Sequence, residues 1–589
     1  MSIVRLGEVH LDWCDECNLP IVEEGRCEIC GNKSRDVEIT PPGDVRPAFE
    51  KDIEAIRETI DKQWGEGYSY EIIPEDKIVL LNGIPYIDKM DEVIVDGEVV
   101  GTHRYNVKKK TKGKYPYEFI LRPWKELKKP EKGYVVIDDG AVEPISDGAS
   151  VLAPGIVEGD EDIEENDEVI IIDKKGNVIC SGSSHHKGSK LIENKSGRGV
   201  KNRWRTSKSD YQPVDDENDW EDVLKANEGI LDERIEESIE FIKNKVEKYG
   251  RDVVVAYSGG KDSLATLHLV MEAGFDPSLL FIDTGIELPE TIENVEKTSE
   301  KHDLELKMRK AHSGYWSNLD HFGPSARDHR WCCKTCKLGP TARLIDEEFD
   351  EGILSFIGQR RYESTQRMNQ GDTWNNPWVP GQRGASPIQD WTALHVWLYL
   401  FRRDAEWNPW YEEGFERIGC WVCPASDLAE LDKLRDNFEE YNRLEEVLKD
   451  YAEKNDLPEE WIELGLWRWK KIPDNVYDLL DKEIIDRITE KTEEVITKPS
   501  KNDMLKDERA KNLVNILGDM EELSLESLNY NDVEDIYRKA KDCVECGICL
   551  ARCEQDALYF DEGIKVDEER CIHCRECLGK CPVVDFDHR

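Results

Sequence analysis

Six residues, Ser258-Gly259-Gly260-Lys261-Asp262-Ser263, separate a segment typical of a buried strand from a segment typical of a helix. The strand is predicted over 251–257, which contains a run of valines, and the helix over 264–271. Two adjacent glycines let the backbone approach an anion closely, and a helix N-terminus offers free N–H groups. The stretch therefore predicts a phosphate-binding loop on an α/β fold, with a plain glycine turn as the alternative.

The side chains of this loop suit a nucleotide phosphate. Lys261 adds a positive charge, and the hydroxyls of Ser258 and Ser263 can donate to phosphate oxygens. The spacing differs from the Walker P-loop and resembles the PP-loop of N-type ATP pyrophosphatases, which include PAPS and APS reductases and tRNA thiolases. This resemblance implies an adenine nucleotide (ATP, APS or PAPS) as ligand, with Lys261 and Asp262 among the catalytic residues.

Further strands are predicted at 279–285, near 305–308 and at 353–358, and they alternate with helices. Such a pattern indicates a parallel sheet whose ligand lies at the carboxyl ends of the strands. Asp283-Thr284-Gly285 is expected there, where Asp283 could hold ribose hydroxyls or a metal ion such as Mg²⁺. Arg360 and Arg361 could bind phosphate or sulfate oxygens, or else pair with Glu363 at the surface.

Several motifs between about Val253 and Pro424 together resemble PAPS and APS reductases. They are Arg330-Trp331-Cys332-Cys333, Gly358-Gln359-Arg360-Arg361-Tyr362-Glu363-Ser364, Pro387-Ile388, Trp391, His395-Val396-Trp397, Asn408-Pro409-Trp410-Tyr411 and Gly419-Cys420 with Cys423-Pro424. Cys332, Cys333, Cys420 and Cys423 match the pattern that holds a [4Fe-4S] cluster in APS reductases, with a zinc site as the alternative. Cys336 is left over as an alternative ligand, a reactive thiol or a buried bystander.

One departure from these reductases concerns their nucleophilic cysteine, which lies in a Glu-Cys-Gly-Leu/Ile-His motif. Here Glu545-Cys546-Gly547-Ile548 continues into Cys549, and spacing assigns Cys546 to a doubled cysteine run typical of a two-cluster ferredoxin. In that arrangement the fourth cysteine of each run crosses to the other cluster. The predicted [4Fe-4S] ligands are Cys543, Cys546, Cys549 and Cys581 for one cluster, and Cys571, Cys574, Cys577 and Cys553 for the other.

Near the N-terminus, Cys14-x-x-Cys17 and Cys27-x-x-Cys30 place four thiols at the spacing of one tetrahedral ion. A structural zinc ribbon is predicted, with redox-active cysteines as the alternative. The chain holds 18 cysteines, and nearly all fall into such pairs or quartets, which favours metal binding in a reducing compartment. No run of 18 apolar residues and no signal peptide is visible, so a cytoplasmic protein without a membrane partner is expected.

Two basic stretches interrupt a chain whose formal net charge is −46. They cover 101–117 and 185–208, and contain aromatic residues such as Tyr105 and Trp204. Between them, Gly133–Asp138, Gly148–Val157 and Asp167–Asp173 resemble, in order, the elements of a PUA domain, a small RNA-binding β-barrel. RNA, such as tRNA, is therefore an expected partner, and a solvated basic face or one bound to the protein's own acids is the alternative.

The sequence thus predicts a multidomain α/β protein: a zinc ribbon (1–42), a small domain of unassigned role (43–130), a PUA-like β-barrel (131–208), a PAPS reductase-like PP-loop domain with a parallel sheet (215–500), a linker (501–535) and a ferredoxin-like 2[4Fe-4S] module (536–589). The first functional hypothesis is reductive sulfur chemistry on an adenine nucleotide, with electrons from a donor entering through the ferredoxin clusters. The second is an RNA-modifying enzyme that adenylates and thiolates a base. A nonenzymatic RNA-binding or redox-sensing protein is a third.

Overall fold

The computed structural model describes residues 10–193, 196–312, 314–478, 482–489, 500–514, 516 and 529–586. The chain forms two compact units. The first contains residues up to 236 together with 360–369 and 390–416, and the second contains 237–359, 370–389 and 417–589. The segment that resembles the reductases is therefore shared between both units. Within the described part of the chain, no helix is long and apolar enough to cross a membrane.

The first unit begins with a small three-stranded antiparallel sheet in the order β2-β1-β3. Its strands are β1 (Asp12–Cys14), β2 (Leu19–Ile21) and β3 (Arg35–Asp36). The strands are too short to form a core alone, and Trp13, Leu19 and Ile21 join a larger cluster that includes Leu394 and Leu398.

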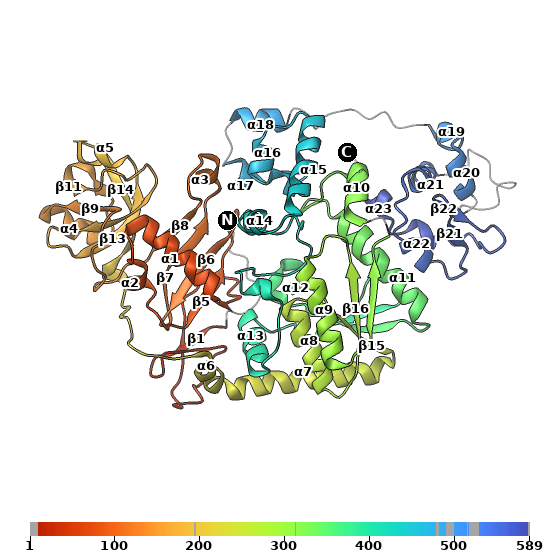
Figure 1. Ribbon diagram of the computed structural model, residues 1–589, viewed down its shortest axis with the longest axis horizontal. Coiled ribbons are helices and arrows are strands. Elements are labelled where there is room, and N and C mark those ends of the chain that lie inside the picture. Colours follow the sequence, from red (N-terminus) through yellow and green to blue (C-terminus); the bar gives the residue numbers. More distant parts are fainter. Residues whose placement is uncertain are drawn as a thin grey trace. The chain divides into compact units, whose positions relative to one another are not determined.

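A five-stranded antiparallel sheet follows, in the order β4-β5-β6-β7-β8 (Figure 1). Its strands are β4 (Arg46–Pro47), β5 (Val79–Gly83), β6 (Met90–Val95), β7 (Glu98–Tyr105) and β8 (Tyr117–Leu121), and its helices are α1 (Glu50–Trp64), α2 (Ser69–Ile72) and α3 (Val107–Thr111). The apolar face of α1, including Ile56, Ile60 and Trp64, is buried against this sheet.

The next sheet has six strands in the order β10-β14-β13-β12-β9-β11, with only β9 and β12 parallel. Its elements are β9 (Tyr134–Ile137), α4 (Asp139–Ser146), β10 (Val151–Leu152), η1 (Ala153–Gly155), β11 (Ile156–Gly159), β12 (Glu168–Ile172), β13 (Val178–Ser184), α5 (Gly188–Glu193), β14 (Arg198–Arg205) and η2 (Thr206–Lys208). Alternate residues of β9 and β12 face different cores: Val135 and Ile171 pack inside this domain, whereas Val136 and Ile172 pack against the preceding one. The 43–130 segment therefore shares a core with this PUA-like domain.

The remaining elements of the first unit are α6 (Trp220–Ala226), the start of α7 (Glu228–Tyr249), η4 (Arg361–Glu363), α12 (Thr365–Met368), α13 (Ala393–Arg402) and η5 (Pro409–Tyr411). His395 on α13 is fully buried, and its Nε2 lies 3.0 Å from Oε1 of Glu23 in the N-terminal sheet region. Arg234 of α7 donates to both oxygens of Glu23, at 2.6 and 2.9 Å. These polar bonds join parts of the unit that are more than 200 positions apart.

The second unit is built on a sheet in the order β17-β16-β15-β18-β20-β19, parallel except for β19. Its strands are β15 (Asp252–Ala256), β16 (Ser278–Asp283), β17 (Leu306–Lys310), β18 (Ile353–Phe356), β19 (Thr373–Asn375) and β20 (Gln382–Ala385). Its helices up to β18 are α8 (Lys261–Glu272), α9 (Pro289–His302), α10 (Gly314–Phe322), the π-helical turn η3 (Cys333–Leu338) and α11 (Gly339–Glu348). The predicted parallel sheet is confirmed, and its chain order reverses between β15 and β18.

Helices follow the sheet in the sequence. They are α14 (Leu428–Asn437), α15 (Tyr441–Lys454), α16 (Glu460–Glu463), η6 (Leu466–Arg468), α17 (Asp474–Tyr477), α18 (Lys482–Thr489), α19 (Lys501–Met504), α20 (Glu508–Val514) and α21 (Tyr530–Asp542). The cysteine-rich end adds α22 (Ile548–Ala551), β21 (Leu558–Phe560), β22 (Ile564–Val566), η8 (Glu576–Leu578) and α23 (Pro582–Asp585).

The described part of the segment expected to be a linker, 501–535, does not run free of the cysteine-rich end. Met504, Leu513 and Val533 share one core with Leu558 and Ile564 of its hairpin. The helices α19 to α21 therefore belong to the ferredoxin module, because they supply the apolar surface that so short a cysteine-rich segment lacks.

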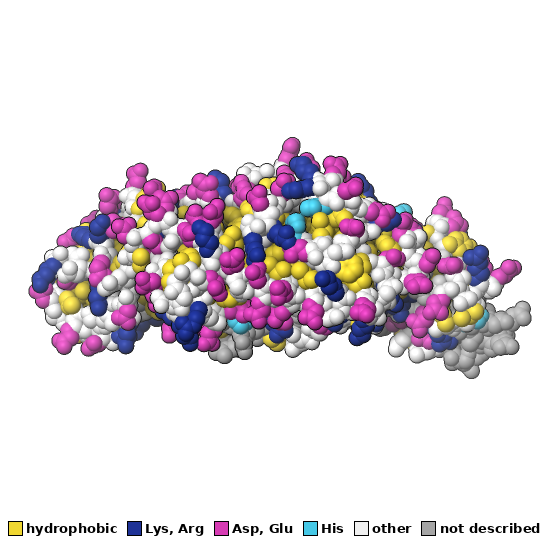
Figure 2. Space-filling view, turned by 90° about the horizontal axis from the view of Figure 1, so that it is seen from below, with side chains coloured by type: hydrophobic (Ala, Val, Ile, Leu, Met, Phe, Trp, Pro, Cys, Tyr) yellow, Lys and Arg dark blue, Asp and Glu magenta, His cyan; other side chains and the backbone are white. Residues whose placement is uncertain are grey.

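Acidic side chains cover much of the surface. Figure 2 shows Asp and Glu side chains across one face, with Lys and Arg scattered between them. This distribution agrees with 126 acidic against 80 basic residues in the chain. Such a surface favours solubility and disfavours polyanions wherever cations are not concentrated.

We predict that the buried ion pair of Arg46 and Asp52 stabilises the first unit strongly. Arg46 donates to both oxygens of Asp52 at 2.7 and 2.9 Å, and these side chains are only 6% and 5% exposed. Asp52→Ala leaves a buried guanidinium without its counter-charge, which should cost about 3–5 kcal/mol. Glu54→Ala, which breaks an exposed pair with Lys51 on the same helix, is the matched control and should change nothing measurable. Urea unfolding followed by tryptophan fluorescence measures both, and equal effects would contradict the prediction.

Candidate nucleotide and metal sites

The predicted phosphate-binding loop lies between β15 and α8 at the carboxyl edge of the parallel sheet. Ser263 organises its turn: its hydroxyl donates to the carbonyl of Gly260 at 2.8 Å and accepts from the backbone N–H of Ser258 at 3.2 Å. Gly259 has φ +73°, a conformation that favours glycine. Lys261 is 3% exposed, and its Nζ lies 3.0 Å from Oδ2 of Asp262. Backbone and side chains thus hold the loop in one shape.

The N-terminus of α8 is suited to an anion. Gly260 is the N-cap residue, and no side chain among the described residues caps this end of the helix. The first N–H groups of a twelve-residue helix therefore keep their donor capacity, next to the ammonium of Lys261. This arrangement can bind a phosphate group of a nucleotide.

Gly358, directly after β18, packs against this loop. A Cβ atom at this position would lie 2.4 Å from the backbone carbon and oxygen of Asp262 and 2.6 Å from the N atom of Ser263. The backbone of Gly358 has no positive φ, so the glycine is required by the close approach and not by its conformation. The contact lies where the chain order of the sheet reverses, which is the usual place for a ligand in such folds.

The turn after β16 connects the nucleotide region to the cysteines. Asp283 is 8% exposed and accepts from the N–H of Gly285 at 2.9 Å. Thr284 donates to Oε1 of Glu287 at 2.8 Å and also lies 3.6 Å from Sγ of Cys420. The predicted nucleotide-binding turn therefore adjoins one of the predicted cluster ligands.

Glu287 is a site residue that the sequence analysis missed. Its carboxylate accepts from Sγ of Cys420 at 3.4 Å as well as from Thr284, and burial raises its pKa. The available sequence signal was an acid between Ile286 and Leu288, two residues that the structure buries. A half-buried carboxylate that accepts from a thiol and from a threonine hydroxyl is held in a fixed position beside Cys420.

The four catalytic-domain cysteines are brought together. Cys332 lies close enough to Cys333, Cys420 and Cys423 for these thiols to raise its pKa. The hydrogen bond from Cys332 and nearby positive charges lower the pKa of Cys333 to about 6. These charges belong to Arg330, Lys337 and Lys334. Four thiols in a positively charged setting form a donor set that fits an anionic metal centre.

Cys336 lies in a different environment from these four cysteines. Its side chain is 1% exposed, and burial raises its pKa to about 11. Its thiol lies 3.3 Å from the hydroxyl of Thr335. Of the three roles considered for Cys336, the buried bystander agrees best with this environment, because a reactive thiol needs access and a lowered pKa.

The two predicted phosphate-binding arginines are engaged by acids of the first unit. Arg360 is 3% exposed and donates from Nη1 to Oδ1 of Asp44 at 2.7 Å. The same carboxylate oxygen accepts from the N–H of Ala393 at the start of α13, at 2.6 Å. Arg361 pairs with Asp390 rather than with Glu363, the partner that the sequence suggested as an alternative. A ligand anion would therefore have to compete with Asp44 for the guanidinium of Arg360.

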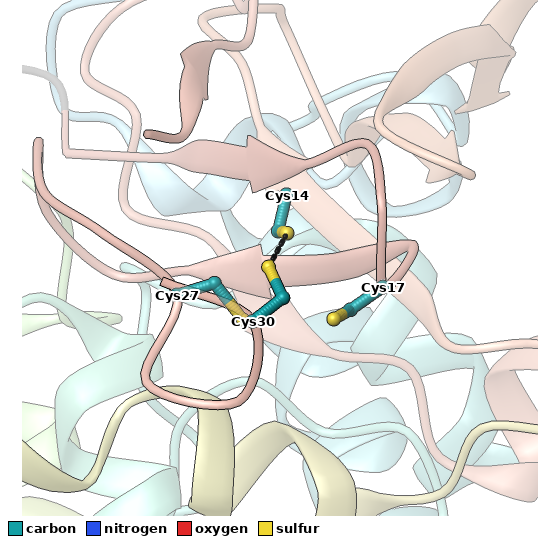
Figure 3. Close-up of side chains that lie close together, drawn as sticks. All are labelled: Cys14, Cys17, Cys27 and Cys30. Atoms are coloured by element: carbon teal, nitrogen blue, oxygen red, sulfur yellow. Dashed lines mark hydrogen bonds between the residues drawn. The ribbon is translucent and has the colours of Figure 1, made fainter. Parts of the chain in front are cut away.

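The N-terminal cysteines form the tightest thiol cluster. Figure 3 shows the side chains of Cys14, Cys17, Cys27 and Cys30 close together, and their sulfur atoms all lie within 4.8 Å of one another. A tetrahedral zinc ion with bonds of about 2.3 Å holds its sulfurs about 3.8 Å apart. Burial raises the pKa of Cys14 to about 11, so thiolates here need a cation. The geometry fits one tetrahedral ion.

In the ferredoxin module, cysteines of the two runs lie close together. One cavity is lined by Cys543, Cys546 and Cys549 of the first run and by Cys581 of the second. The second set is also close, since Cys553 and Cys571 both raise the pKa of Cys577, while Cys574 is exposed. The first set fits an iron–sulfur cluster, because its four thiols line one cavity.

The two basic stretches differ in how their charges are used. In the first, Glu118 binds both Arg104, at 2.7 Å, and Lys109, at 2.8 Å, so the alternative of pairing with the protein's own acids holds for these side chains. In the second, Arg198, Lys201 and Lys208 are exposed and form no ion pair with any residue that the structure describes. Lys195 of this stretch lies outside the described residues.

Family profiles match three separate parts of the chain. The phosphoadenosine phosphosulfate reductase domain matches residues 252–426, the PUA domain 133–204 and the 4Fe-4S dicluster domain 542–584. The chain therefore contains a PAPS reductase-like domain, a PUA domain and a 4Fe-4S dicluster domain. The resemblances seen in the sequence are confirmed at this level.

Similarity also extends over most of the chain. The uncharacterized protein MJ0066 of Methanocaldococcus jannaschii is 39% identical over 476 residues, which cover 79% of this chain and 97% of that protein. The chain therefore belongs to the same family as MJ0066. An adenosine 5′-phosphosulfate reductase of Geobacillus kaustophilus is 28% identical over 195 residues, 31% of this chain and 78% of that protein. A PAPS reductase structure from Candida auris, a phosphate complex, aligns with a TM-score of 0.26 at 18% identity, covering 31% of this chain and 88% of that one.

We predict that Gly358→Ala weakens adenine nucleotide binding at least tenfold, because its Cβ would displace the backbone at the start of α8. Gly371→Ala is the matched control in the same unit, since its Cβ would meet nothing closer than 3.8 Å. Isothermal titration with ATP under anaerobic conditions measures both affinities. Equal affinities of the two variants would separate nucleotide binding from this contact.

Proposed function

We propose that this protein is an iron–sulfur enzyme that binds an adenine nucleotide at its PP-loop and carries out reductive sulfur chemistry. The observation that carries the proposal is the position of the ferredoxin module within the second unit. Its helix α22 packs against α11, which follows the turn η3 that begins at Cys333. A redox module held beside the cysteines of a nucleotide-binding domain favours reduction over simple nucleotide hydrolysis.

Two glycines allow this close packing. A Cβ on Gly339, the first residue of α11, would lie 2.5 Å from the carbonyl oxygen of Cys546. A Cβ on Gly547 would lie 2.0 Å from Cδ of Arg343. Figure 1 shows α22 next to α11 in this unit. The backbone of a predicted cluster ligand thus contacts the helix that extends the Cys332–Cys333 segment.

Polar contacts support the same interface. Nε2 of His312, just after β17, lies 2.9 Å from Oε2 of Glu545. Arg552 donates to the carbonyl of Pro377 at 3.2 Å, although this bond is exposed. The interface between the module and the rest of the unit therefore combines these polar contacts with close backbone packing at Gly339.

The proposal gives separate tasks to the PP-loop, to the turn after β16 and to the two arginines. The N–H groups of α8 and Lys261 bind nucleotide phosphates, and Asp262 fixes the ammonium of Lys261 through their 3.0 Å contact. Asp283, Thr284 and Gly285 bind the ribose or a metal ion such as Mg²⁺ beside Cys420. Arg360 and Arg361 serve an anionic group of the substrate if Asp44 and Asp390 release them.

The electron balance matches the cofactors that these cysteines suit. Reduction of an adenylyl sulfate to AMP and bisulfite breaks the bond between sulfur and the bridging oxygen, and takes up two electrons and one proton. Two [4Fe-4S] clusters in the ferredoxin module, when bound, would supply one electron each, and an external donor would restore them. We assign a third cluster to Cys332, Cys333, Cys420 and Cys423, and structural zinc to the N-terminal cysteines.

RNA modification is the second candidate, and a specific observation favours it. The PUA domain match is accompanied by the exposed cations Arg198 and Lys201 on β14, which form no ion pair with any described residue, and Trp204 of the same strand is 41% exposed. The guanidinium of Arg122 lies 4.3 Å above the ring of Trp204. Cations next to an exposed aromatic ring suit unpaired RNA bases. In this case the enzyme would transfer the adenylyl group of ATP to a base carbonyl and release pyrophosphate. A sulfur nucleophile would then displace AMP from the base.

We predict that anaerobically reduced protein forms sulfite and AMP from APS or PAPS without RNA. Lys261→Ala should lower this rate at least 100-fold, because it removes the phosphate-binding charge from a buried position, and should leave the cluster absorption unchanged. Lys297→Ala, which removes an exposed lysine on α9, is the matched control and should keep full activity.

Parallel reactions with ATP and bulk tRNA distinguish the two candidates. Sulfite from an adenylyl sulfate supports the reductase. AMP and pyrophosphate that appear only with RNA, and without sulfite, would overturn it in favour of the second candidate. Full activity of Lys261→Ala would remove the PP-loop from either mechanism.

A further inference from the structure

Lys539 is a buried lysine in the middle of the ferredoxin module. It lies on α21, whose neighbouring residues Ile536 and Ala540 pack into the core of the module. Lys539 is 1% exposed. Burying an ammonium costs several kcal/mol unless negative charge surrounds it, so such a position calls for a counter-charge.

The surroundings of Lys539 are sulfur ligands of both predicted clusters. Its Nζ donates a hydrogen bond to the carbonyl of Cys577, a residue of the second ligand set. The same side chain lines the cavity formed by the first ligand set, Cys543, Cys546, Cys549 and Cys581. Lys539 therefore contacts both ligand sets from a helix that precedes either cysteine run in the sequence.

No carboxylate compensates this charge within the part of the chain that the structure describes. Lys539 forms no ion pair there, and its side chain instead meets the carbonyl of Cys577 and the cavity lined by the first ligand set. The counter-charge that this lysine requires is thus supplied by the thiolates and by whatever they bind.

We infer that Lys539 is a positioning residue that holds a fixed positive charge between the two cluster sites and makes both clusters easier to reduce. Each one-electron reduction adds a negative charge to a cluster, and a buried cation a few ångströms away stabilises the reduced state. The inference depends on cluster binding by the module and not on the substrate proposed above. It would hold equally for a sulfur reductase and for an RNA-modifying enzyme.

The test compares three variants of the full-length, cluster-loaded protein. Lys539→Met removes the charge and keeps most of the side-chain volume, Lys539→Arg keeps the charge, and Lys541→Met removes an exposed lysine from the same helix. The readout is the midpoint potential of the clusters in a dithionite titration followed by electron paramagnetic resonance, with iron and sulfide content measured alongside.

We expect Lys539→Met to lower the equilibrium constant for one-electron reduction at least tenfold, a shift of about 59 mV to more negative potential. Lys539→Arg and Lys541→Met should each shift the midpoint potential several times less. If Lys539→Met loses its clusters while Lys539→Arg retains them, the charge is needed to hold the anionic clusters, which also supports the inference. Unchanged potentials in fully loaded Lys539→Met, or equal cluster loss in both Lys539 variants, would overturn it.

Discussion

The close contact between Gly339 and Cys546 is the constraint on which the functional account depends. A side chain at Gly339 would collide with the carbonyl of Cys546, so only glycine allows the ferredoxin module to approach α11. The same segment of chain, from Cys332 to the end of α11, carries two of the four cysteines of this domain and contacts α22 of the module. The predicted redox ligands and the parallel sheet therefore belong to one compact unit, as the proposed delivery of electrons from within the chain requires.

The nucleotide side of this unit is built by similarly close backbone packing. Gly358 allows the end of β18 to contact the PP-loop closely. Thr284 lies beside Cys420, and Glu287 accepts hydrogen bonds from both of these residues. In the first unit, Asp44 holds Arg360 and buries it. Under the proposal, an anionic group of the substrate either displaces Asp44 from Arg360 or binds without this arginine.

Local patterns predicted the local features well. The valine run before Ser258 predicted β15, and the spacing of the doubled cysteine run predicted that Cys581 would join Cys543, Cys546 and Cys549, because both depend on neighbouring residues or fixed intervals. The engagement of Arg360 by Asp44, of Lys109 by Glu118 and of Cys420 by Glu287 was not predictable in this way. These contacts arise between segments that only the tertiary fold brings together, and a charge count along the chain cannot detect them. For the same reason the sequence does not distinguish Lys539 from the other charged residues of α21, whereas the structure buries it beside cysteines of both runs.

The central claim is that this chain delivers its own electrons to a sulfur substrate bound at the PP-loop. A single-turnover experiment tests it most directly: the protein is reduced, excess dithionite is removed, and APS or PAPS is mixed in while cluster absorption and sulfite are followed. The account predicts that the clusters reoxidise on addition of the nucleotide, with one sulfite formed for every two electrons lost. Clusters that stay reduced in the presence of both nucleotides, while ATP and tRNA yield AMP and pyrophosphate, would contradict it.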